Sequence, residues 1–444
     1  MATAAAIPTG QLLRILGIGF GIAAVVGGMV GQGILRTPGI VAGAIGSPGL
    51  MLALWIAGGA IAGLTAIATV ELGSSMPCAG GPYAFARRAF GPFAGTMVGW
   101  ADWIISVSTL AFLGVVVGEF THRLGLFTGV SVGLLASSVI AVFWAVNWTG
   151  TRIGGASQMI GSALKGVGLI LLVGFLFAGP AVSPTEANAD SLPVALGIGA
   201  FAIAMRAIQN TYDGWNSAIY FCEELHEPER NLARAIFGGI TLVTFLYFLV
   251  NAAVLHVLTP AAMARSTLPA ADASAVVLGA WADPALTLFG IISVGAALNL
   301  NLMFSSRIVY AMAKDGALPS VLQKVAATGT PRLALTATTI GAAILSATGS
   351  YMTLIAINVA FGVVINMIMN LAVIRLRQTE PSLPRPFRTP FYPVPIIATL
   401  LINSVLLVAL IYEDSFYSLI GMAAVGAIGL IYKIRERVVG IRPT

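Results

Sequence analysis

The chain has 444 residues, of which 58% are hydrophobic and only 9% are charged, and its formal net charge is +6. Soluble domains carry about 25% charged residues, so this composition excludes an ordinary soluble domain and indicates a polytopic membrane protein. The positive charge does not indicate nucleic-acid binding, because no basic stripe with interleaved aromatic residues lies outside the hydrophobic runs.

The hydrophobic runs predict an all-α integral membrane protein with twelve transmembrane helices, each run being long enough to cross about 30 Å of hydrocarbon. In the first run Arg14 precedes a hydrophobic stretch, as in a signal peptide, but the stretch is too long and ends at no small-residue cleavage site, so we expect an uncleaved helix. Because the connections are short, residues 1–444 are predicted to form a single transmembrane domain. In chain order the runs are 13–44, 48–75, 93–122, 128–149, 155–180, 195–222, 233–258, 284–313, 333–350, 352–376, 393–412 and 415–434.

The basic residues predict the orientation of the chain. With the N-terminus in the cytoplasm, Lys and Arg gather in the cytoplasmic loops and the C-terminal tail, whereas the outer loops hold only Arg123 and Arg265. Cytoplasmic loops of membrane proteins carry such an excess. We therefore expect a multi-pass protein of the cell membrane, surrounded by the lipid bilayer, with both termini in the cytoplasm.

Two of the predicted helices are interrupted near their centres. Gly-Gln-Gly at 31–33 breaks the first run, and Asp-Gly-Trp-Asn at 213–216 breaks the sixth. At membrane depth a break persists only where its free amide and carbonyl groups find partners. Amides at the start of a half-helix attract a carboxylate, and carbonyls at the end of a half-helix attract an ammonium group. Two such breaks predict a site for an amino acid zwitterion in the middle of the membrane.

A simpler interpretation of the first break stays open. Gly27, Gly28, Gly31 and Gly33 can serve close packing between helices, as small residues do in membranes. That interpretation does not account for Gln32 or for the second polar break.

Short motifs that recur in order along the chain carry a family resemblance. The string Gly-Met-Val-Gly-Gln-Gly-Ile-Leu-Arg-Thr-Pro-Gly covers 28–39, and Tyr-Asp-Gly-Trp-Asn at 212–216 is followed by Glu-Glu at 223–224. The others are Glu-Leu-Gly at 71–73, Pro-Cys-Ala-Gly-Gly-Pro-Tyr at 77–83, Phe-Gly-Pro at 90–92, Tyr-Ala-Met-Ala-Lys-Asp-Gly-Ala-Leu-Pro at 310–319 and Arg-Pro-Phe-Arg-Thr-Pro at 385–390. Together they resemble the amino acid–polyamine–organocation (APC) superfamily, and most of all its L-type amino acid transporters and their bacterial relatives.

The resemblance implies a LeuT-like fold, which is a five-plus-five inverted repeat with broken helices one and six. Repeat one would cover about 13–180 and repeat two about 195–376, with appended helices at about 393–434. A substrate between the broken helices would place its carboxylate near the amides of Gln32 and Gly33. Its α-amino group would lie near the carbonyls of Met29, Asn210, Thr211 and Asp213. The implied substrate-binding residues are Met29, Gly31, Gln32, Gly33, Ile34, Asn210, Thr211, Tyr212, Asp213, Gly214 and Trp215.

The chain departs from the family pattern at three of these positions. Gln32 stands where relatives have a small residue, Asn210 where an aromatic gate is common, and Asp213 where glycine is common. The resemblance therefore predicts an amino acid substrate without predicting its side chain, and a polyamine or another amine stays an alternative.

Lys165 lies inside the fifth run, where a charge is costly and indicates function. It matches the lysine that proton-coupled and exchanging relatives carry in place of a sodium ion. We expect its ammonium group to bind first-helix carbonyls near Val26–Gly28. Two roles stay open, namely proton exchange coupled to transport and a fixed charge that only holds the two helices together.

Asp213 also has several open roles. It can accept a hydrogen bond from a substrate amine, pair with Arg36 or Arg206, or titrate. We favour a position facing the cavity, because the break separates Asp213 from Arg206. Elsewhere we expect structural roles for Glu71, Asp102 and Glu119, and a cytoplasmic network that steadies a gate for Glu223, Glu224 and Arg230.

The remaining residues predict no cofactor and no metal site. Cys78 and Cys222 match no metal or redox spacing, and the histidines lie in loops or near a span end. Because no catalytic Ser–His pair or pair of aspartates lies at depth, we do not expect an intramembrane enzyme. A transport-inactive amino acid sensor stays an alternative. Some L-type members need a heavy chain joined through an outer-loop cysteine; the loop at 122–129 has none, so we expect no disulfide-linked heavy chain.

Overall fold

The computed structural model describes residues 11–31, 33–183, 197–347, 351–413 and Gly429. Over these residues the regular structure is helical, apart from one isolated bridge between Leu16 and Leu225. The helices are α1 (Ile18–Met29), α2 (Gly33–Ile45), α3 (Pro48–Ser75), α4 (Pro82–Phe90), α5 (Pro92–Arg123), α6 (Val132–Thr149), α7 (Thr151–Ala178), α9 (Ile198–Tyr212), η1 (Trp215–Phe221), α10 (Pro228–Val257), α11 (Pro260–Arg265), α12 (Pro269–Leu278), η2 (Gly279–Trp281), α13 (Ala282–Lys314), η3 (Ser320–Gln323), α14 (Arg332–Ser346), α15 (Tyr351–Thr379) and α16 (Val394–Glu413).

Seven of the described helical stretches are long and apolar enough to cross a membrane, and the bent pair α1–α2 makes an eighth. They are α3, α5, α6, α7, α10, the Phe361–Thr379 part of α15 and the stretch Pro269–Lys314 that contains α13. The run predicted at 48–75 matches α3 residue for residue, because Pro48 fits the first turn of a helix, where its missing amide costs no hydrogen bond. The twelve-span count and the inverted repeat stay predictions, and the run 415–434 lies outside the described residues except for Gly429.

Both predicted interruptions are present in the structure. The first run divides into α1 and α2, which are bent by 48° at the break. The sixth run divides into α9 and the 3₁₀ helix η1, with Asp213 and Gly214 between them. Packing pairs the four halves, since α1 lies against η1 and α2 lies against α9. The two breaks therefore meet at the same level of the helix bundle.

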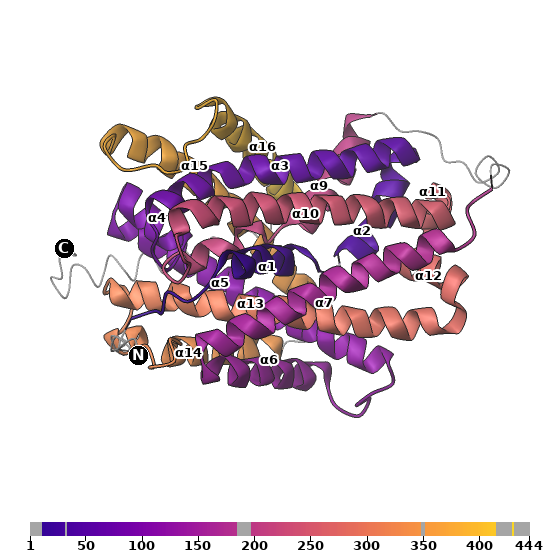
Figure 1. Ribbon diagram of the computed structural model, residues 1–444, viewed down its shortest axis with the longest axis horizontal. Helices are drawn as coiled ribbons and strands as arrows, with labels where there is room; N and C mark the ends of the chain where they lie inside the picture. Colours follow the sequence, from indigo (N-terminus) through magenta and orange to yellow (C-terminus); the bar gives the residue numbers. More distant parts are fainter. Residues whose placement is uncertain (1–10, 32, 184–196, 348–350, 414–428, 430–444) are drawn as a thin grey trace, which may run out of the picture.

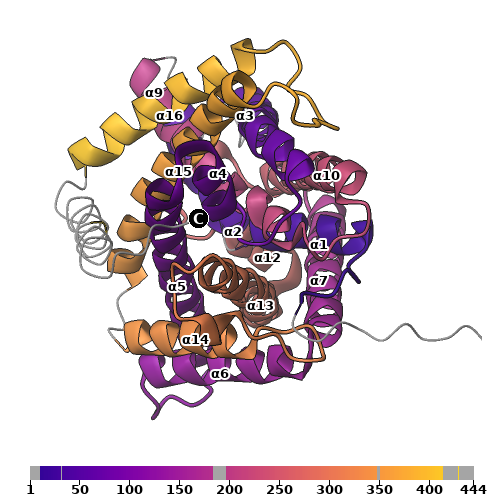
Figure 2. The same cartoon turned by 90° about the vertical axis from the view of Figure 1, so that its left-hand side faces the viewer.

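The arrangement of the long helices brings polar residues to the first break. The long helices run along the longest axis of the molecule, and α1 and α2 lie near its middle (Figure 1). Seen along that axis, α6 and α14 form an outer layer against α5 (Figure 2). On the other side, α7 and α10 both pack against α1, so their side chains can reach the free carbonyls at its end.

Much of the outer surface is apolar. Ile160 and Ile170 on α7, Phe245 on α10 and Leu401 on α16 are all exposed. A protein in water rarely exposes large contiguous apolar patches, whereas these faces suit contact with hydrocarbon. The surface thus agrees with the composition in indicating a multi-pass membrane protein.

Candidate functional site

The first break opens onto empty space. Helix α1 ends at Met29, the amide of Val30 closes its last turn on the carbonyl of Val26 at 2.9 Å, and the chain becomes helical again at Gly33. A Cβ atom added to Gly31 would meet no other atom within 4 Å. Gly31 is therefore not explained by close packing, and the site has room for a group beside it.

Hydrogen bonds within the second break stabilise its non-helical backbone. Asp213 is extended, and Gly214 has a φ of +99°, a conformation that strongly favours glycine. The Gly214 amide donates to Asp213 Oδ1 at 2.9 Å, and the hydroxyl of Ser217 donates to the Gly214 carbonyl at 2.7 Å. These bonds satisfy part of the backbone that the interruption frees.

The two broken helices touch through glycine backbone. A Cβ atom on Gly214 would lie 2.6 Å from the carbonyl carbon and oxygen of Gly28, and one on Gly28 would lie 2.5 Å from the Gly214 carbonyl oxygen. Gly27 packs in the same tight way against Gln158 and Ser162 of α7. The packing interpretation thus holds for Gly27 and Gly28, but not for Gly31.

The structure places the predicted substrate-binding residues around this crossing, although as substrate contacts they stay predictions. The side chains of Thr37 and Thr211 join α2 to α9 through hydroxyls 2.8 Å apart. The Tyr212 hydroxyl donates to the Trp55 carbonyl at 2.9 Å, so it is directed at α3 and not at the break. Gln32 lies outside the described residues. Of the others, Met29, Ile34, Thr211, Tyr212 and Trp215 are buried, Gly31, Gly33 and Gly214 are partly exposed, and Asn210 and Asp213 are exposed.

Asp213 leaves its carboxylate accessible. One of its oxygens accepts from the neighbouring Gly214 amide, and no ion pair joins it to Arg36 or Arg206 within the parts of the chain that the structure describes. Of the open roles, pairing with either arginine is thus not observed. A carboxylate oxygen beside two helix ends can accept from an amine.

Lys165 binds the end of α1, as expected from the sequence. Its side chain is completely buried, and its ammonium group donates to the carbonyls of Gly27 and Val30, both at 2.7 Å. Val30 also accepts from the hydroxyl of Ser293 on α13 at 3.3 Å. Carbonyls at a helix end carry partial negative charge, which stabilises the buried ammonium group. The contact is confirmed, while its role in coupling stays a prediction.

A network of buried side-chain amides joins α7 to α6 and α13, and it was not predicted from the sequence. Asn299 of α13 donates to the Gln158 side chain at 3.1 Å, and Gln158 donates to Ser162 at 3.1 Å. Ser162 in turn donates to the Ala23 carbonyl at 2.6 Å, and Asn147 of α6 donates to Asn299 at 2.8 Å. Fully paired buried amides fix side-chain positions, so this network holds α1 against α7 and α13.

Tyr247 of α10 is a second residue that sequence reasoning missed. Its hydroxyl donates to the Met29 carbonyl at 2.7 Å and lies 3.2 Å from the Thr211 carbonyl. Two of the four carbonyls predicted to receive the substrate amine are therefore in contact with Tyr247. The sequence did carry one signal for this contact, namely a tyrosine inside an apolar run. A buried tyrosine hydroxyl needs a hydrogen-bond partner.

An ion pair closes the end of η1 that is predicted to face the cytoplasm. Arg307 of α13 donates from Nε and from one terminal nitrogen to the two carboxylate oxygens of Glu224, each at 2.9 Å, and both side chains are almost completely buried. Arg307 also donates to Thr151 at the start of α7 at 3.2 Å. The Glu224 carbonyl accepts from the Leu16 amide at 2.9 Å. The pair thus links the segment before α1, η1, α7 and α13.

Further pairs lie beside this one. Lys314 lies 3.4 Å from Glu223, and Asp315 accepts from the Tyr83 hydroxyl at 3.0 Å and lies 3.2 Å from Arg87. Burial, with the Asp315 carboxylate, raises the pKa of Tyr83, so its hydroxyl stays a donor. The expected network thus exists, but Arg307 and Lys314 supply the cations for Glu224 and Glu223. Among the described contacts, Arg230 makes no ion pair with either glutamate.

Glu71 and Asp102, two of the three predicted structural acids, have partners on distant helices, whereas Glu119 is exposed. Glu71 accepts from Arg377 at 2.8 and 2.7 Å, and Asp102 accepts from the hydroxyl of Tyr220 on η1 at 2.9 Å. Cys78 and Cys222 are both free. Over the described residues, no group of three or more His, Cys, Asp or Glu side chains has the arrangement of a metal site.

Comparison with known proteins gives a consistent set of relatives. The sequence model of the family described as "Amino acid permease" matches residues 20–428. The chain is 30% identical to the b(0,+)-type amino acid transporter 1 of Mus musculus, over 92% of this chain and 85% of that protein. It is 32% identical to the large neutral amino acids transporter small subunit 2 of Mus musculus, over 82% of this chain and 70% of that protein. The Asc-type amino acid transporter 1 of Mus musculus is also 32% identical, over 68% of this chain and 58% of that protein.

Proposed function

Because the chain belongs to the amino acid permease family, we propose that it is a secondary active transporter that moves amino acids across the cell membrane by alternating access. The family is one of transporters and not of enzymes. The observation that carries the proposal is the crossing of two interrupted helices at Gly28 and Gly214, next to open space at Gly31. A site at such a crossing can be opened to either side when the half-helices rock.

The proposed substrate is held by main-chain groups. The start of α2, which begins at Gly33, faces its carboxylate, since helix N-termini favour negative charge; the Gln32 amide stays a predicted contact. Its ammonium group lies near the carbonyls that end α1 and α9 and near the carboxylate of Asp213, which is exposed. The main-chain contacts bind the head group common to all amino acids, whereas the Asp213 carboxylate also favours substrates with an added positive charge.

Lys165 is the proposed coupling residue. Its ammonium group binds Gly27 and Val30 as a bound cation would, and release of its proton would remove the charge that strengthens both hydrogen bonds. In a proton-coupled transporter this release alternates with transport, whereas in an amino acid exchanger the charge stays fixed. The relatives include a protein named as a small subunit. For this chain we propose no disulfide-linked heavy chain, because the outer loop at 122–129 lacks cysteine.

Uptake into liposomes tests the proposal. Purified protein should accumulate or exchange radiolabelled amino acids, measured with a panel of twenty amino acids and common amines under proton and sodium gradients. Absence of uptake and exchange for every compound would contradict transport. If amino acids nevertheless raised the melting temperature, the result would favour a sensor, because a ligand that binds the folded state stabilises it.

A bulky side chain at the first break tests the location of the site. Gly31→Trp should fill the open space and abolish uptake. Gly174→Trp is the matched control, because Gly174 on α7 is exposed and an added Cβ there also meets nothing within 4 Å. Equal uptake by the two variants would show that the substrate does not pass Gly31.

A further inference from the structure

Three acidic side chains are buried among the residues that the structure describes, and one of them has no basic partner. Glu71 binds Arg377, and Glu224 binds Arg307. Asp102 of α5 is 4% exposed and takes part in none of the described ion pairs. An ionised carboxylate in an apolar interior is so costly without a paired charge that it takes up a proton instead. An ionisable group inside a membrane span also indicates function.

The described helices around Asp102 direct their charges elsewhere. Those packed against α5 are α4, α6, α13, α14 and α15, and α6 carries no ionisable side chain. Asp213 precedes η1 and Glu223 follows it, and neither can neutralise a second carboxylate. The charged residues of α5 itself, from Glu119 onward, lie about 25 Å along the helix. The remaining ionisable side chains on these helices are exposed or contact other groups; they are Tyr83, Arg87, Arg88, Asp283, Arg307, Tyr310, Lys314, Arg332, Arg375 and Arg377.

The described partner of the Asp102 carboxyl group is the hydroxyl of Tyr220 on η1. This hydroxyl lies 2.9 Å from one carboxyl oxygen and 3.1 Å from the other. Tyr220 is 2% exposed, and its ring stacks on Phe304 of α13 with centroids 4.6 Å apart. A Cβ atom added to Gly81 would lie 3.0 Å from the same ring. The ring is therefore confined, and its hydroxyl is directed at Asp102.

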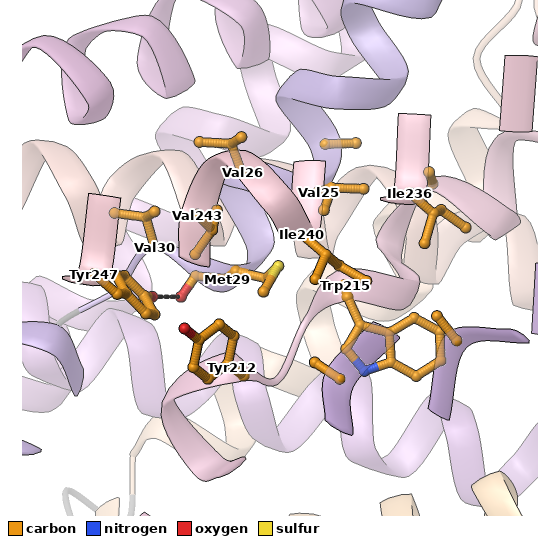
Figure 3. Close-up of a cluster of buried hydrophobic side chains, with 14 of the residues drawn as sticks. Val25, Val26, Met29, Val30, Tyr212, Trp215, Ile236, Ile240, Val243 and Tyr247 are labelled. Carbon is orange, nitrogen blue, oxygen red and sulfur yellow. Dashed lines mark hydrogen bonds between the residues drawn. The ribbon is translucent and has the colours of Figure 1, made fainter. Parts of the chain in front are cut away.

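The 3₁₀ helix that carries Tyr220 lies in a dry part of the bundle. Trp215, at its start, belongs to the same buried hydrophobic cluster as Met29 of α1 and Ile240 of α10 (Figure 3). Ala218 and Ile219, which precede Tyr220, are completely buried. Water therefore reaches the carboxyl group of Asp102 only when η1 moves away from α5.

We propose that Asp102 is a proton-binding site of the gate formed by η1, with its carboxyl group protonated while η1 lies against α5. The inference rests on the proposed function, in which the half-helices move. In the closed arrangement the phenol donates to one carboxyl oxygen, and the acid proton on the other oxygen can return a hydrogen bond to the phenol, which accounts for both short distances. When η1 moves away, the carboxyl O–H bond breaks, its electron pair stays on the carboxylate, and the proton passes to water. Opening releases a proton, so rising pH favours the open gate and falling pH the closed one.

Infrared spectroscopy tests the protonation of Asp102 without depending on transport. The carbonyl stretch of a carboxylic acid is resolved from the bands of a carboxylate. At about pH 6, where ordinary acids are ionised, the spectrum of the purified wild-type chain minus that of Asp102→Asn should show an acid band. Glu227→Gln is the matched control, because Glu227 is exposed and should give only carboxylate bands in the same subtraction. An Asp102 spectrum with carboxylate bands and no acid band would overturn the inference.

A second variant keeps the test available if Asp102→Asn does not fold. Tyr220→Phe removes only the phenol hydroxyl, so the acid carbonyl loses its donor and its band should move to higher frequency. An acid band that does not move would show that it belongs to another group and would overturn the inference.

The pH dependence of opening tests the link to the gate. Cys222 is completely buried two residues after Tyr220, and in a Cys78→Ala background its labelling by a maleimide reports opening. The ratio of the labelling rates of the Asp102 parent and Asp102→Asn cancels the pH dependence of the thiol. This ratio should rise with pH, by up to about tenfold per unit, because only the parent releases a proton on opening.

The outcomes separate this inference from the proposed function. A labelling ratio that does not change with pH would contradict the inference, even in a chain that transports amino acids. Absence of transport by the wild-type chain would contradict the proposed function and the gate with it. A missing acid band in a chain that transports contradicts the inference alone.

Discussion

Replacing Glu224 by glutamine leaves the Arg307 guanidinium buried without a counter-charge. Glu224 has no exposed surface, and the side chain of Arg307 is only 2% exposed. The amide of the introduced glutamine would keep one acceptor oxygen but would direct its NH₂ group at a guanidinium nitrogen, which is also a donor. The substitution therefore breaks one of two charge-assisted bonds and removes the charge from the other.

The expected cost is large because the site is dry. Removing one partner of a buried ion pair destabilises a protein by about 3–5 kcal/mol. The pair links the segment before α1, η1, α7 and α13, so we expect this cost to appear first as local opening of that end of the bundle. At about 1.4 kcal/mol per factor of ten, the open population rises at least about a hundredfold.

Thiol labelling of Cys222 measures this opening. Cys222 is completely buried and lies two residues before Glu224. It reacts with a maleimide only when the segment opens, so its labelling rate reports the open population. The measurement uses a Cys78→Ala background, which leaves one thiol. We expect labelling of Glu224→Gln to be about a hundredfold faster or more than that of the parent.

Two further variants decide whether the buried charge is the cause. Glu227→Gln makes the same acid-to-amide change three residues away, at an exposed side chain, and should label at the parental rate. Adding Arg307→Met to Glu224→Gln removes the unpaired charge and should slow labelling again, because replacing both partners of a buried pair is often neutral. Equal labelling rates for Glu224→Gln and Glu227→Gln would refute the reasoning.

Three further predictions concern the candidate site. Lys165→Ala should abolish uptake driven by a pH gradient and spare exchange of labelled for unlabelled amino acid; unchanged pH-driven accumulation would remove Lys165 from coupling. Asp213→Asn should change the rank order of substrates by weakening those with an added positive charge, and an identical ranking in competition assays would place Asp213 off the substrate path. Gly28→Ala should destabilise the protein by roughly 1–3 kcal/mol through overpacking against Gly214, whereas Gly31→Ala should fold normally, as thermal unfolding can check.

The positions of the breaks could be predicted from sequence because their causes are local. Glycines and polar residues inside an apolar run cannot continue a membrane helix without partners, and this reasoning located the breaks at 31–33 and 213–216. Local signals also gave the limits of α3, which begins at Pro48. Whether a glycine packs or lines a space was not predictable, because this depends on helices distant in the sequence. Gly27 contacts α7, whereas a Cβ on Gly31 would contact nothing.

The partners of charged groups were harder to predict than the groups themselves. The expected network included Glu223 and Glu224 but assigned Arg230 to it, which is near in sequence. In the structure Glu224 binds Arg307, which is 83 residues away, because α13 packs against η1. The guanidinium group of Arg307 can be buried there because its donors lie close to acceptors on Met303, Ser306, Thr151 and Glu224. Met303 and Ser306 lie on the same helix as Arg307, but Thr151 and Glu224 are brought to it by tertiary packing, which has no sequence signature.

The end of α1 shows why a break and its donors must be considered together. Interrupting a helix in an apolar bundle frees carbonyls, and the structure serves them with three kinds of donor: the ammonium group of Lys165, the phenol of Tyr247 and the hydroxyl of Ser293. These donors come from α7, α10 and α13, each of which packs against α1. A charged donor binds a carbonyl more strongly than a neutral donor does. Of the three, only the ammonium group is charged, so loss of one proton would weaken the hydrogen bonds to α1 at Lys165 while those of Tyr247 and Ser293 stay the same. We therefore propose that coupling belongs to Lys165, while Tyr247 and Ser293 hold the same helix end in place.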